Sequence, residues 1–430
     1  MLKYLKKNNF DNKEIKNAWW LIAGRITQMI VSLFISIITA RYLGPNNYGI
    51  INYGTAYVTF FMSFCTLGIN SIIIKDFVDH PKEQGKTIGT TLLLRIVSSS
   101  ISILMIICSV SIIDKNEPLT ISVTVLCAMG LVFQVFDTIN YWFQSLYLSK
   151  ITSMATLLAY LITSIYKIIL FLLNKDIRWF AFASSIDYIF LALFLYIVYK
   201  KYHGPKLSFS WEKGKYLLSK SYHYILSGMM VAIYGQTDKL MLKHMLNETS
   251  VGYFSLASSI NSMWVFVLSA IIDSMYPTIV RLSLKNKDEF DKKNRQLYAL
   301  IIYISIFVAF IFMCFGKIAI KIIYGEAYLG AANPLKIITW YTIFAYLGVA
   351  RNSWIVCENK QRYLKYMYLS AAIINIVLNY ILIPVWGASG AAFASLITQI
   401  MTCILLPAII KNMRPNAKLI VEAFLLKKMK

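Results

Sequence analysis

The chain has 430 residues, of which 58% are hydrophobic and 15% are charged, and its formal net charge is +23. Soluble domains carry about 25% charged residues, whereas apolar runs of roughly 20 residues, each long enough to cross a bilayer, recur along this sequence. The composition therefore predicts an integral membrane protein and excludes a soluble nucleic-acid-binding protein. The six cysteines and four histidines show no paired or ligand spacing, so neither a disulfide framework nor a metal site is expected.

Twelve apolar segments are expected to span the membrane as helices, because lipid offers the backbone of an open chain no other hydrogen-bond partner. The segment before the first span is lysine-rich and too polar for a cleavable signal peptide. Gly44 and Pro45 turn the chain after the first span. The predicted spans are 18–39, 48–73, 88–113, 119–147, 150–173, 178–199, 222–243, 250–275, 297–316, 334–357, 364–384 and 388–410.

Lysine and arginine fall mainly in alternate connections between these spans. Of the 43 residues, 30 lie in segments that share a side with the N-terminus, 8 lie on the opposite side and five lie within predicted spans. Cytoplasmic loops of membrane proteins are enriched in Lys and Arg. The distribution therefore places both termini in the cytoplasm.

The spans divide six and six. Residues 1–199 are predicted to form an N-terminal lobe with a cytoplasmic segment at 1–17, 200–221 a cytoplasmic linker, and 222–410 a C-terminal lobe. Residues 411–430 are predicted to form a basic amphipathic tail at the cytoplasmic surface, or simply a solubilising tail. Leu43 and Gly49 recur as Leu246 and Gly252, and Ala-Phe-Ala-Ser recurs at 181–184 and 392–395. Parallel repeats of even helix number are related by an axis along the membrane normal. The predicted fold class is an all-α integral membrane protein with two six-helix lobes related by pseudo-two-fold symmetry.

Features of a catalyst are missing from the sequence. No connection exceeds about two dozen residues, none outside the membrane pairs carboxylates with a base, and no Gly-rich phosphate loop ends in Lys-Ser or Lys-Thr. Neither an enzyme nor a bound cofactor is therefore expected. Transport is the function class that remains.

Three segments resemble the bacterial polysaccharide-repeat flippases of the Wzx type: ARYLGPNNYGIINY at 40–53, TDKLMLKHMLNETSVGYFSLASSI at 237–260, and NIVLNYILIPVWGASGAAFASLITQ at 375–399. These flippases belong to the multidrug/oligosaccharidyl-lipid/polysaccharide exporter superfamily, and the likeness covers nearly the whole chain. It implies two lobes around a central cavity that exchange access between the two leaflets. The implied cargo is an undecaprenyl-pyrophosphate-linked oligosaccharide, moved to the outer leaflet of the bacterial inner membrane for O-antigen or capsule assembly. The implied partners are membrane lipids, a polysaccharide polymerase and a chain-length regulator, and no nucleic acid.

Two alternatives stay open. The first is a cation-coupled multidrug exporter of small amphiphiles on the same fold, against which the cationic rather than acidic membrane interior argues. The second is a membrane glycan polymerase or ligase, against which the lack of a large outer loop argues.

Five cations lie within predicted spans: Arg25, Arg95, Lys167, Lys239 and Arg351. A charge at the centre of a transmembrane helix costs about 2.5–3.5 kcal/mol on insertion scales, so each is expected to face a partner or a wet cavity. The topology places the arginines toward the cytoplasm and the lysines further out. This predicts that the arginines capture the cargo pyrophosphate with bidentate hydrogen bonds, and that the lysines receive it before release.

Two aspartates are candidates for coupling to Na⁺ or H⁺. Asp238 precedes Lys239, and adjacent helix positions point in different directions, so the two are poor partners for each other. Asp137, midway along the fourth span, is the second candidate. The alternative for both the cations and the acids is that they brace helices, with Asp187 and Asp273 as further partners. The sequence leaves the coupling ion open, since an anionic cargo moving outward already gains ~2.3 kcal/mol per charge per 100 mV.

Overall fold

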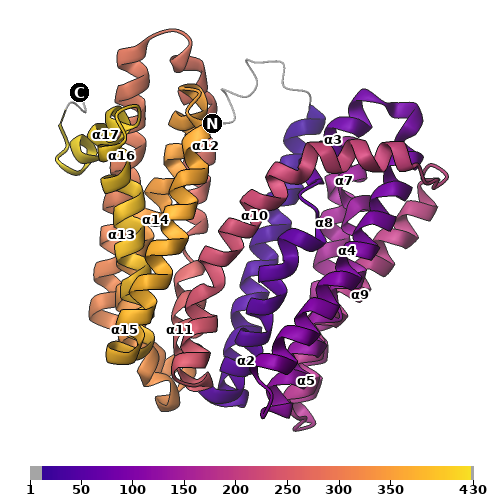
Figure 1. The fold of residues 1–430 in the computed structure, drawn as a ribbon, viewed down its shortest axis with the longest axis horizontal. Coiled ribbons are helices and arrows are strands. Elements are labelled where there is room, and N and C mark those ends of the chain that lie inside the picture. The colour runs from indigo at the N-terminus through magenta and orange to yellow at the C-terminus, as the bar shows by residue number, and fades with distance from the viewer. Residues whose placement is uncertain (1–11, 428–430) are drawn as a thin grey trace. The chain divides into compact units, whose positions relative to one another are not determined.

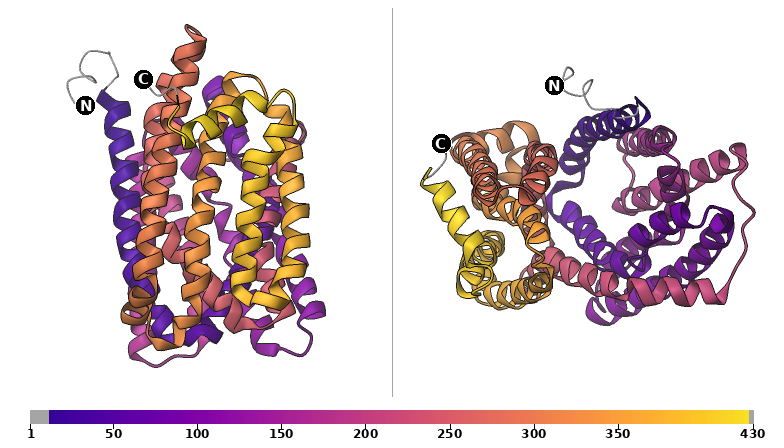
Figure 2. Two further views of the ribbon diagram at one scale, coloured as in Figure 1. Left: turned by 90° about the vertical axis from the view of Figure 1, so that its left-hand side faces the viewer. Right: turned by 90° about the horizontal axis from the view of Figure 1, so that it is seen from above.

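Every regular element of the described residues is a helix (Figure 1 and Figure 2). The computed structural model describes the backbone of residues 12–427 and the side chains of residue 24 and residues 26–427 apart from positions 71 and 227. The first helices are α2 (Asn12–Cys65), α3 (Asn70–Asp79), α4 (Gln84–Ile113), α5 (Pro118–Ala128), α6 (Leu131–Gln134), α7 (Asp137–Ser145), α8 (Ser149–Leu172), α9 (Ile177–Lys201) and α10 (Trp211–Met245). They are followed by α11 (Glu248–Ser262), α12 (Phe266–Ser283), α13 (Lys287–Tyr324), α14 (Ala332–Cys357), α15 (Leu364–Ile400), a π-helical turn at Met401–Leu405, α16 (Leu406–Ile409) and α17 (Arg414–Phe424). The prediction of an all-α membrane fold is confirmed.

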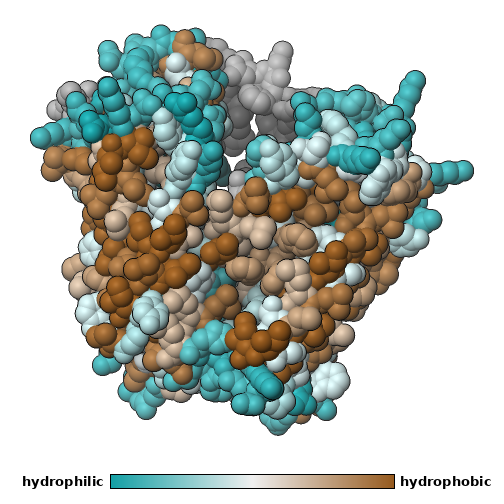
Figure 3. Space-filling model, viewed as in Figure 1, coloured by the Kyte–Doolittle hydropathy of each residue, from teal (hydrophilic) through white to brown (hydrophobic). Residues whose placement is uncertain are grey.

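Hydrophobic side chains cover the middle of the helices, and hydrophilic ones gather at both ends of the face in Figure 3. Large apolar residues such as Leu172, Phe307 and Ile112 are more than half exposed, which an aqueous solvent would penalise. Within the described residues, eight helices are long and apolar enough to cross a membrane. Two of them, Ile26–Cys65 and Gln361–Ile409, each overlap two predicted spans. The total of twelve spans stays a prediction.

Glycines in non-helical conformations divide two of the long apolar helices, α2 and α15. Gly44 has φ 71° within α2, directly before Pro45, and Gly387 has φ 58° within α15. These conformations are open to glycine at little cost. Both breaks lie where the sequence predicts that a span ends. In contrast, the predicted eighth span at 250–275 is interrupted, because α11 ends at Ser262 and α12 begins at Phe266.

The chain folds into two compact units. Unit 1 comprises the chain up to Tyr42 together with Gly54–Ala232, and unit 2 comprises Leu43–Tyr53 and Ile233–Lys430. The chain thus passes from unit 1 to unit 2 within α10, between Ala232 and Ile233. The first part of α10 packs in unit 1, where Leu217 is fully buried in the core. The predicted linker 200–221 belongs to unit 1.

A short piece of the first half, Leu43–Tyr53, belongs to unit 2. A Cβ at Gly49 would lie 1.8 Å from the carbonyl oxygen of Glu248, and one at Gly252 would lie 2.1 Å from that of Pro45. Glycine is therefore required at both positions for the two backbones to approach. The hydroxyl of Tyr53 also lies 2.8 Å from Nε2 of His244.

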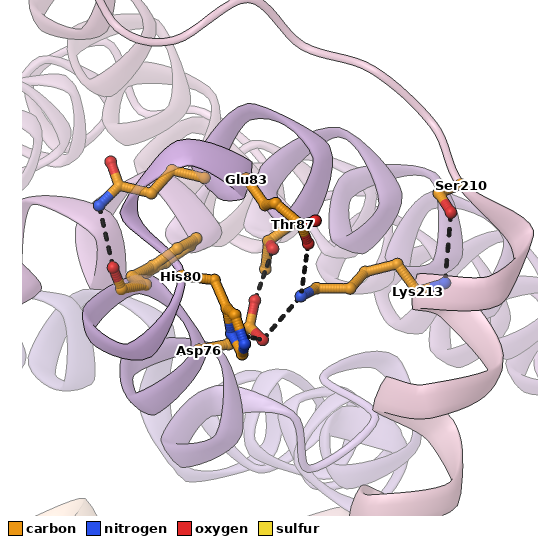
Figure 4. A network of polar contacts seen from close by, with 8 residues as sticks. Asp76, His80, Glu83, Thr87, Ser210 and Lys213 are labelled. Atoms are coloured by element: carbon orange, nitrogen blue, oxygen red, sulfur yellow. Dashed lines mark hydrogen bonds and ion pairs between the residues drawn. The ribbon is translucent and has the colours of Figure 1, made fainter.

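An ion pair attaches the start of α10 to unit 1 (Figure 4). The Lys213 ammonium donates to Asp76 Oδ1 at 2.8 Å, and the exposed fractions of these side chains are 9% and 2%. Thr87 donates to the other carboxylate oxygen of Asp76 at 2.6 Å. Upstream, the backbone of Ser208 donates to the Gly85 carbonyl at 3.3 Å, so the segment before α10 follows α4.

The C-terminal helix α17 lies across α13 rather than projecting from unit 2 (Figure 2). Its apolar residues Leu419, Ile420 and Ala423 are buried in the unit 2 core. Arg295 of α13 donates to Glu422 at 3.0 Å. The predicted amphipathic tail is thus a helix whose apolar face packs on protein.

Candidate functional site

Arg95 is almost fully buried within unit 1, with 2% of its surface exposed. Its guanidinium donates to Thr138 Oγ1 at 3.1 Å, to the carbonyl of Thr66 at 3.2 Å and to the side chain of Asn70. Thr66 is the first residue after α2, where a helix leaves carbonyls without intrahelical partners, and its carbonyl accepts from the backbone of Ile69 at 3.3 Å as well as from Arg95. Arg95 therefore joins the end of α2 to α3 and α7, and that role occupies most of its donors.

Arg351 makes a similar contact within unit 2, where it is 6% exposed. It donates to the carbonyls of Thr402 at 2.9 Å and Cys403 at 3.4 Å. Both carbonyls belong to the π-helical turn Met401–Leu405, and a π-turn displaces carbonyls from the usual α-helical pairing. Arg95 and Arg351 thus both donate to backbone carbonyls where a helix ends or departs from α-helical hydrogen bonding. The side chain of Arg25 lies outside the described residues.

Lys167 lines a cavity of about 250 Å³ within unit 1. The cavity lies among α2, α5, α8 and α9, and Asp187, Tyr160 and Tyr188 also line it. Among the side chains that the structure describes, none makes a hydrogen bond or ion pair with the Lys167 ammonium. This ammonium is therefore available to a ligand.

Lys239 lines a second cavity, of about 230 Å³, within unit 2. Its neighbours there include Tyr234, Asn261 and Tyr341. No hydrogen bond or ion pair with another described residue occupies its ammonium either. The two membrane lysines thus differ from Arg95 and Arg351, which each donate to neighbouring residues, although Nε of both arginines has no partner among the described atoms.

Asp238, adjacent to Lys239, accepts hydrogen bonds from three neutral residues and is 6% exposed. Asn379 donates to Oδ1 at 2.6 Å, Asn375 donates to Oδ1 at 3.1 Å, and Ser395 donates to Oδ2 at 2.6 Å. The side-chain oxygen of Asn379 is itself buried without a hydrogen-bond partner among the described atoms. A carboxylate and an unsatisfied amide oxygen together suit a small hard cation, which prefers oxygen ligands.

Asp137, the second coupling candidate, is half-buried at the start of α7 and accepts from Asn140 at 2.9 Å. Asp273, named above as a bracing partner, is exposed on α12. Within the described residues, no three histidines, cysteines or carboxylates gather as a metal-binding group.

Sequence reasoning missed Asn375 and Asn379 as partners of Asp238. The signal was present in the sequence, because two asparagines four residues apart share one face of a helix, here inside the apolar run NIVLNYILI. Ser395 was noted only as part of the repeated Ala-Phe-Ala-Ser segment.

Residues 15–283 match the family model described as "Polysaccharide biosynthesis protein", and residues 224–381 match the model named MatE. The chain belongs to the polysaccharide biosynthesis protein family. Membership of the multidrug/oligosaccharidyl-lipid/polysaccharide exporter superfamily, predicted from the resemblance, is confirmed with it.

The curated proteins similar to this chain share about a fifth to a quarter of its residues in the matched regions. CapF, a capsular polysaccharide biosynthesis protein of Staphylococcus aureus, is 19% identical over 403 residues, which cover 91% of this chain and 97% of CapF. An uncharacterised membrane protein of Methanocaldococcus jannaschii is 24% identical over 296 residues, 64% of this chain. The chain spans 57% of the length of that archaeal protein.

Solved structures confirm the fold of this family member. An inward-facing multidrug resistance MATE family transporter of the MOP superfamily has a TM-score of 0.68 at 13% identity, covering 91% of this chain and 94% of its own. The lipid II flippase MurJ, in an inward closed conformation, has a TM-score of 0.64 at 14% identity, covering 94% and 91%. At these identities the likeness concerns the fold.

Proposed function

We propose that this protein is a flippase that moves an undecaprenyl-pyrophosphate-linked oligosaccharide from the cytoplasmic to the outer leaflet, for polysaccharide assembly. The observation that carries the proposal is the free ammonium of Lys167 and of Lys239, each in a cavity of one unit of a polysaccharide biosynthesis family member. A cation without a hydrogen-bond or ion-pair partner inside a membrane protein costs free energy, and such residues mark substrate or ion pathways. Pyrophosphate is the anionic group that such a lipid-linked cargo carries.

The proposed division of labour between the cations modifies the sequence-based hypothesis of an arginine tier. Arg95 and Arg351 donate to neighbouring residues of their own units, so we assign them to bracing the lobes. Lys167 and Lys239 then contact the pyrophosphate, as point charges that bind phosphate without fixed geometry. Arg25 remains a candidate for the same role.

The direction of transport follows from charge. An inside-negative membrane potential favours outward movement of an anion by ~2.3 kcal/mol per charge per 100 mV. We place the protein in the bacterial inner membrane with both termini in the cytoplasm, since 30 of its 43 Lys and Arg residues lie in the segments assigned to that side. A polymerase and a chain-length regulator would consume the cargo on the outer side.

Asp238 is the proposed coupling residue. Its carboxylate oxygens, the free side-chain oxygen of Asn379 and the hydroxyl of Ser395 are hard ligands that would hold Na⁺, and the carboxylate alone would hold a proton. A bound cation would offset the buried negative charge in the membrane interior. Asp137 is a weaker candidate, because its exposure and its partner Asn140 are typical of a helix start.

Reconstitution tests the flippase proposal. Purified protein in liposomes should accelerate movement of a fluorescent undecaprenyl-pyrophosphate-linked oligosaccharide between leaflets, measured with a membrane-impermeant quencher. Lys167→Met and Lys239→Met should abolish the acceleration, whereas Lys175→Met, at an exposed lysine, should not. A protein that leaves this lipid in place but exports a small amphiphilic cation would instead support the multidrug alternative.

Ion replacement tests the coupling proposal. Replacing Na⁺ by choline, or collapsing a proton gradient, should slow transport by the wild type and leave the residual rate of Asp238→Asn unchanged. Asp273→Asn, at an exposed carboxylate of the same unit, is the matched control. Full transport by Asp238→Asn, with unchanged ion dependence, would exclude Asp238 as the coupling residue.

A further inference from the structure

The cavity of unit 1 holds a carboxylate whose hydrogen-bonding capacity is largely unused. Asp187 accepts one described hydrogen bond, from Thr163 Oγ1 at 3.4 Å. The same hydroxyl lies 3.0 Å from the carbonyl of Ala159, which competes for its single proton. Asp187 is half-buried, and carboxylates withdrawn from water are normally paired or fully hydrogen-bonded, because their desolvation is expensive. Asp187 therefore keeps acceptor sites free for a ligand.

The carboxylate in the unit 2 cavity has less of this capacity. Asp238 accepts from Asn375, Asn379 and Ser395 at 3.1, 2.6 and 2.6 Å. Three donors of its own unit therefore already hydrogen-bond to its two oxygens, whereas Asp187 has one long hydrogen bond. Of the two cavities, the one in unit 1 thus presents a free carboxylate together with a free ammonium.

Size and chemistry restrict what the unit 1 cavity can bind. Its volume of about 250 Å³ falls below the ~300–1,000 Å³ typical of drug-sized ligands and suits a single sugar ring. Ring hydroxyls can donate to a carboxylate and accept from an ammonium at once, whereas phosphate can only use the ammonium. The rings of Tyr160 and Tyr188 in the lining add the aromatic surface against which the apolar face of a sugar packs.

We propose that the Asp187 cavity binds the sugar ring attached directly to the pyrophosphate. Asp187 accepts hydrogen bonds from ring hydroxyls, and Lys167 contacts the adjoining phosphate. This assignment rests on the proposed flippase function, and it adds that the protein recognises the first sugar as well as the lipid pyrophosphate. Recognition of the headgroup then depends on unit 1, and the acid of unit 2 is left for coupling.

Binding of defined lipids tests this assignment. Affinities of the purified full-length protein in nanodiscs are measured for undecaprenyl pyrophosphate alone and for the same lipid carrying one glucose, galactose, N-acetylglucosamine or glucuronic acid. At least one sugar-bearing lipid should bind about tenfold more tightly than the sugar-free lipid, as expected for hydrogen bonds to a charged acceptor. Asp187→Asn should remove this difference and leave the affinity for the sugar-free lipid within about twofold. Lys167→Met should weaken binding of both lipids.

The controls separate the possible failures. Asp176→Asn makes the same chemical change at an exposed carboxylate before α9 and should alter neither affinity. Tyr188→Phe, which keeps the ring and removes a hydroxyl, should reduce the preference for sugar in part and provides a second variant if Asp187→Asn does not fold. Equal wild-type binding of all five lipids, or equal weakening of both lipid classes by Asp187→Asn, would overturn the sugar subsite. Failure of the wild type to bind undecaprenyl pyrophosphate at all would instead overturn the flippase proposal.

Discussion

Replacement of the membrane cations by methionine should separate two roles. Arg95→Met removes hydrogen bonds to Thr138, Asn70 and the Thr66 carbonyl, and a buried polar group left without a partner costs about 1–3 kcal/mol. The Thr66 carbonyl keeps a second hydrogen bond, from the backbone N–H of Ile69 at 3.3 Å. Thr138 and Asn70 can turn to other partners, and removal of a buried charge gives back part of the cost. The net loss of stability should be about 2–3 kcal/mol. For a unit of this size that corresponds to a fall in melting temperature on the order of 5–10 °C.

Lys167→Met should give the opposite result. The variant loses no described hydrogen bond and removes a charge whose presence in a transmembrane helix is unfavourable by about 2.5–3.5 kcal/mol on insertion scales. Loss of the cation that shares the cavity with the Asp187 carboxylate offsets part of that gain. The melting temperature should therefore stay close to that of the wild type, while lipid translocation is lost. Melting is followed by fluorescence-detected size-exclusion chromatography after heating, and translocation by the liposome assay at equal protein content. An Arg95→Met protein with unchanged melting but no transport would refute the bracing role and return arginine to the cargo path.

Two further predictions concern packing. Lys213→Met should lower stability by about 2–3 kcal/mol, because the buried Asp76 carboxylate loses its ammonium partner and keeps only Thr87 and the His80 ring. Asp76→Asn should cost less, since Lys213 still reaches Glu83 at 3.4 Å. An equal cost for the two variants in melting experiments would contradict this. Gly49→Ala and Gly252→Ala should each be destabilising by more than about 1 kcal/mol, because the added methyl meets backbone oxygens at 1.8 and 2.1 Å. Gly348→Ala is the control, because nothing lies within 4 Å of the added Cβ, and it should be neutral or stabilising by up to about 1 kcal/mol. Similar melting temperatures for all three glycine variants would count against the packing of Leu43–Tyr53 in unit 2.

Local signals made most of the helices predictable from sequence. Apolar length defines a span, and Gly44 with Pro45 marks its end, because glycine there adopts a positive φ. The break between α11 and α12 had no such signal, since residues 263–265 are Met-Trp-Val. Its polar neighbour Asn261 exchanges hydrogen bonds with Thr342 and accepts one from the Trp264 ring nitrogen. That break depends on a contact 81 residues away in sequence, which a local pattern does not contain.

The repeated glycines carried more information than the sequence interpretation took from them. Gly49 and Gly252 indicated duplication because each follows a leucine by six residues. In the structure the two repeats also contact one another, Gly49 at Glu248 and Gly252 at Pro45. A non-local approach of this kind is invisible in a single sequence, since glycine serves turns, close packing and repeats alike. This close approach of the two backbones agrees with the assignment of Leu43–Tyr53 to unit 2.

Charge alone located candidate residues but did not rank them. Sequence identifies Arg95 and Lys167 equally as cations within spans, and only the hydrogen bonds show that the first is occupied and the second is free. The arginines find partners because helix irregularities expose carbonyls nearby, at Thr66 and at Thr402. A sequence does not show where packing interrupts a helix, so it does not reveal these carbonyl partners. Topology alone therefore favoured the hypothesis that the arginines bind pyrophosphate.

The hydrogen bonds in the two cavities give a physical reason for the proposed division of function. Each unit has a cavity with one aspartate and one lysine, Asp187 with Lys167 and Asp238 with Lys239. Two asparagines and a serine satisfy Asp238, whereas Asp187 has one long hydrogen bond. A carboxylate surrounded by fixed amide and hydroxyl groups selects a small ion, because there is little room to rearrange. A carboxylate with free acceptor sites suits a polyhydroxylated group, whose many donors can satisfy it. Coupling in unit 2 and headgroup recognition in unit 1 are therefore the roles that each cavity's own hydrogen bonds favour.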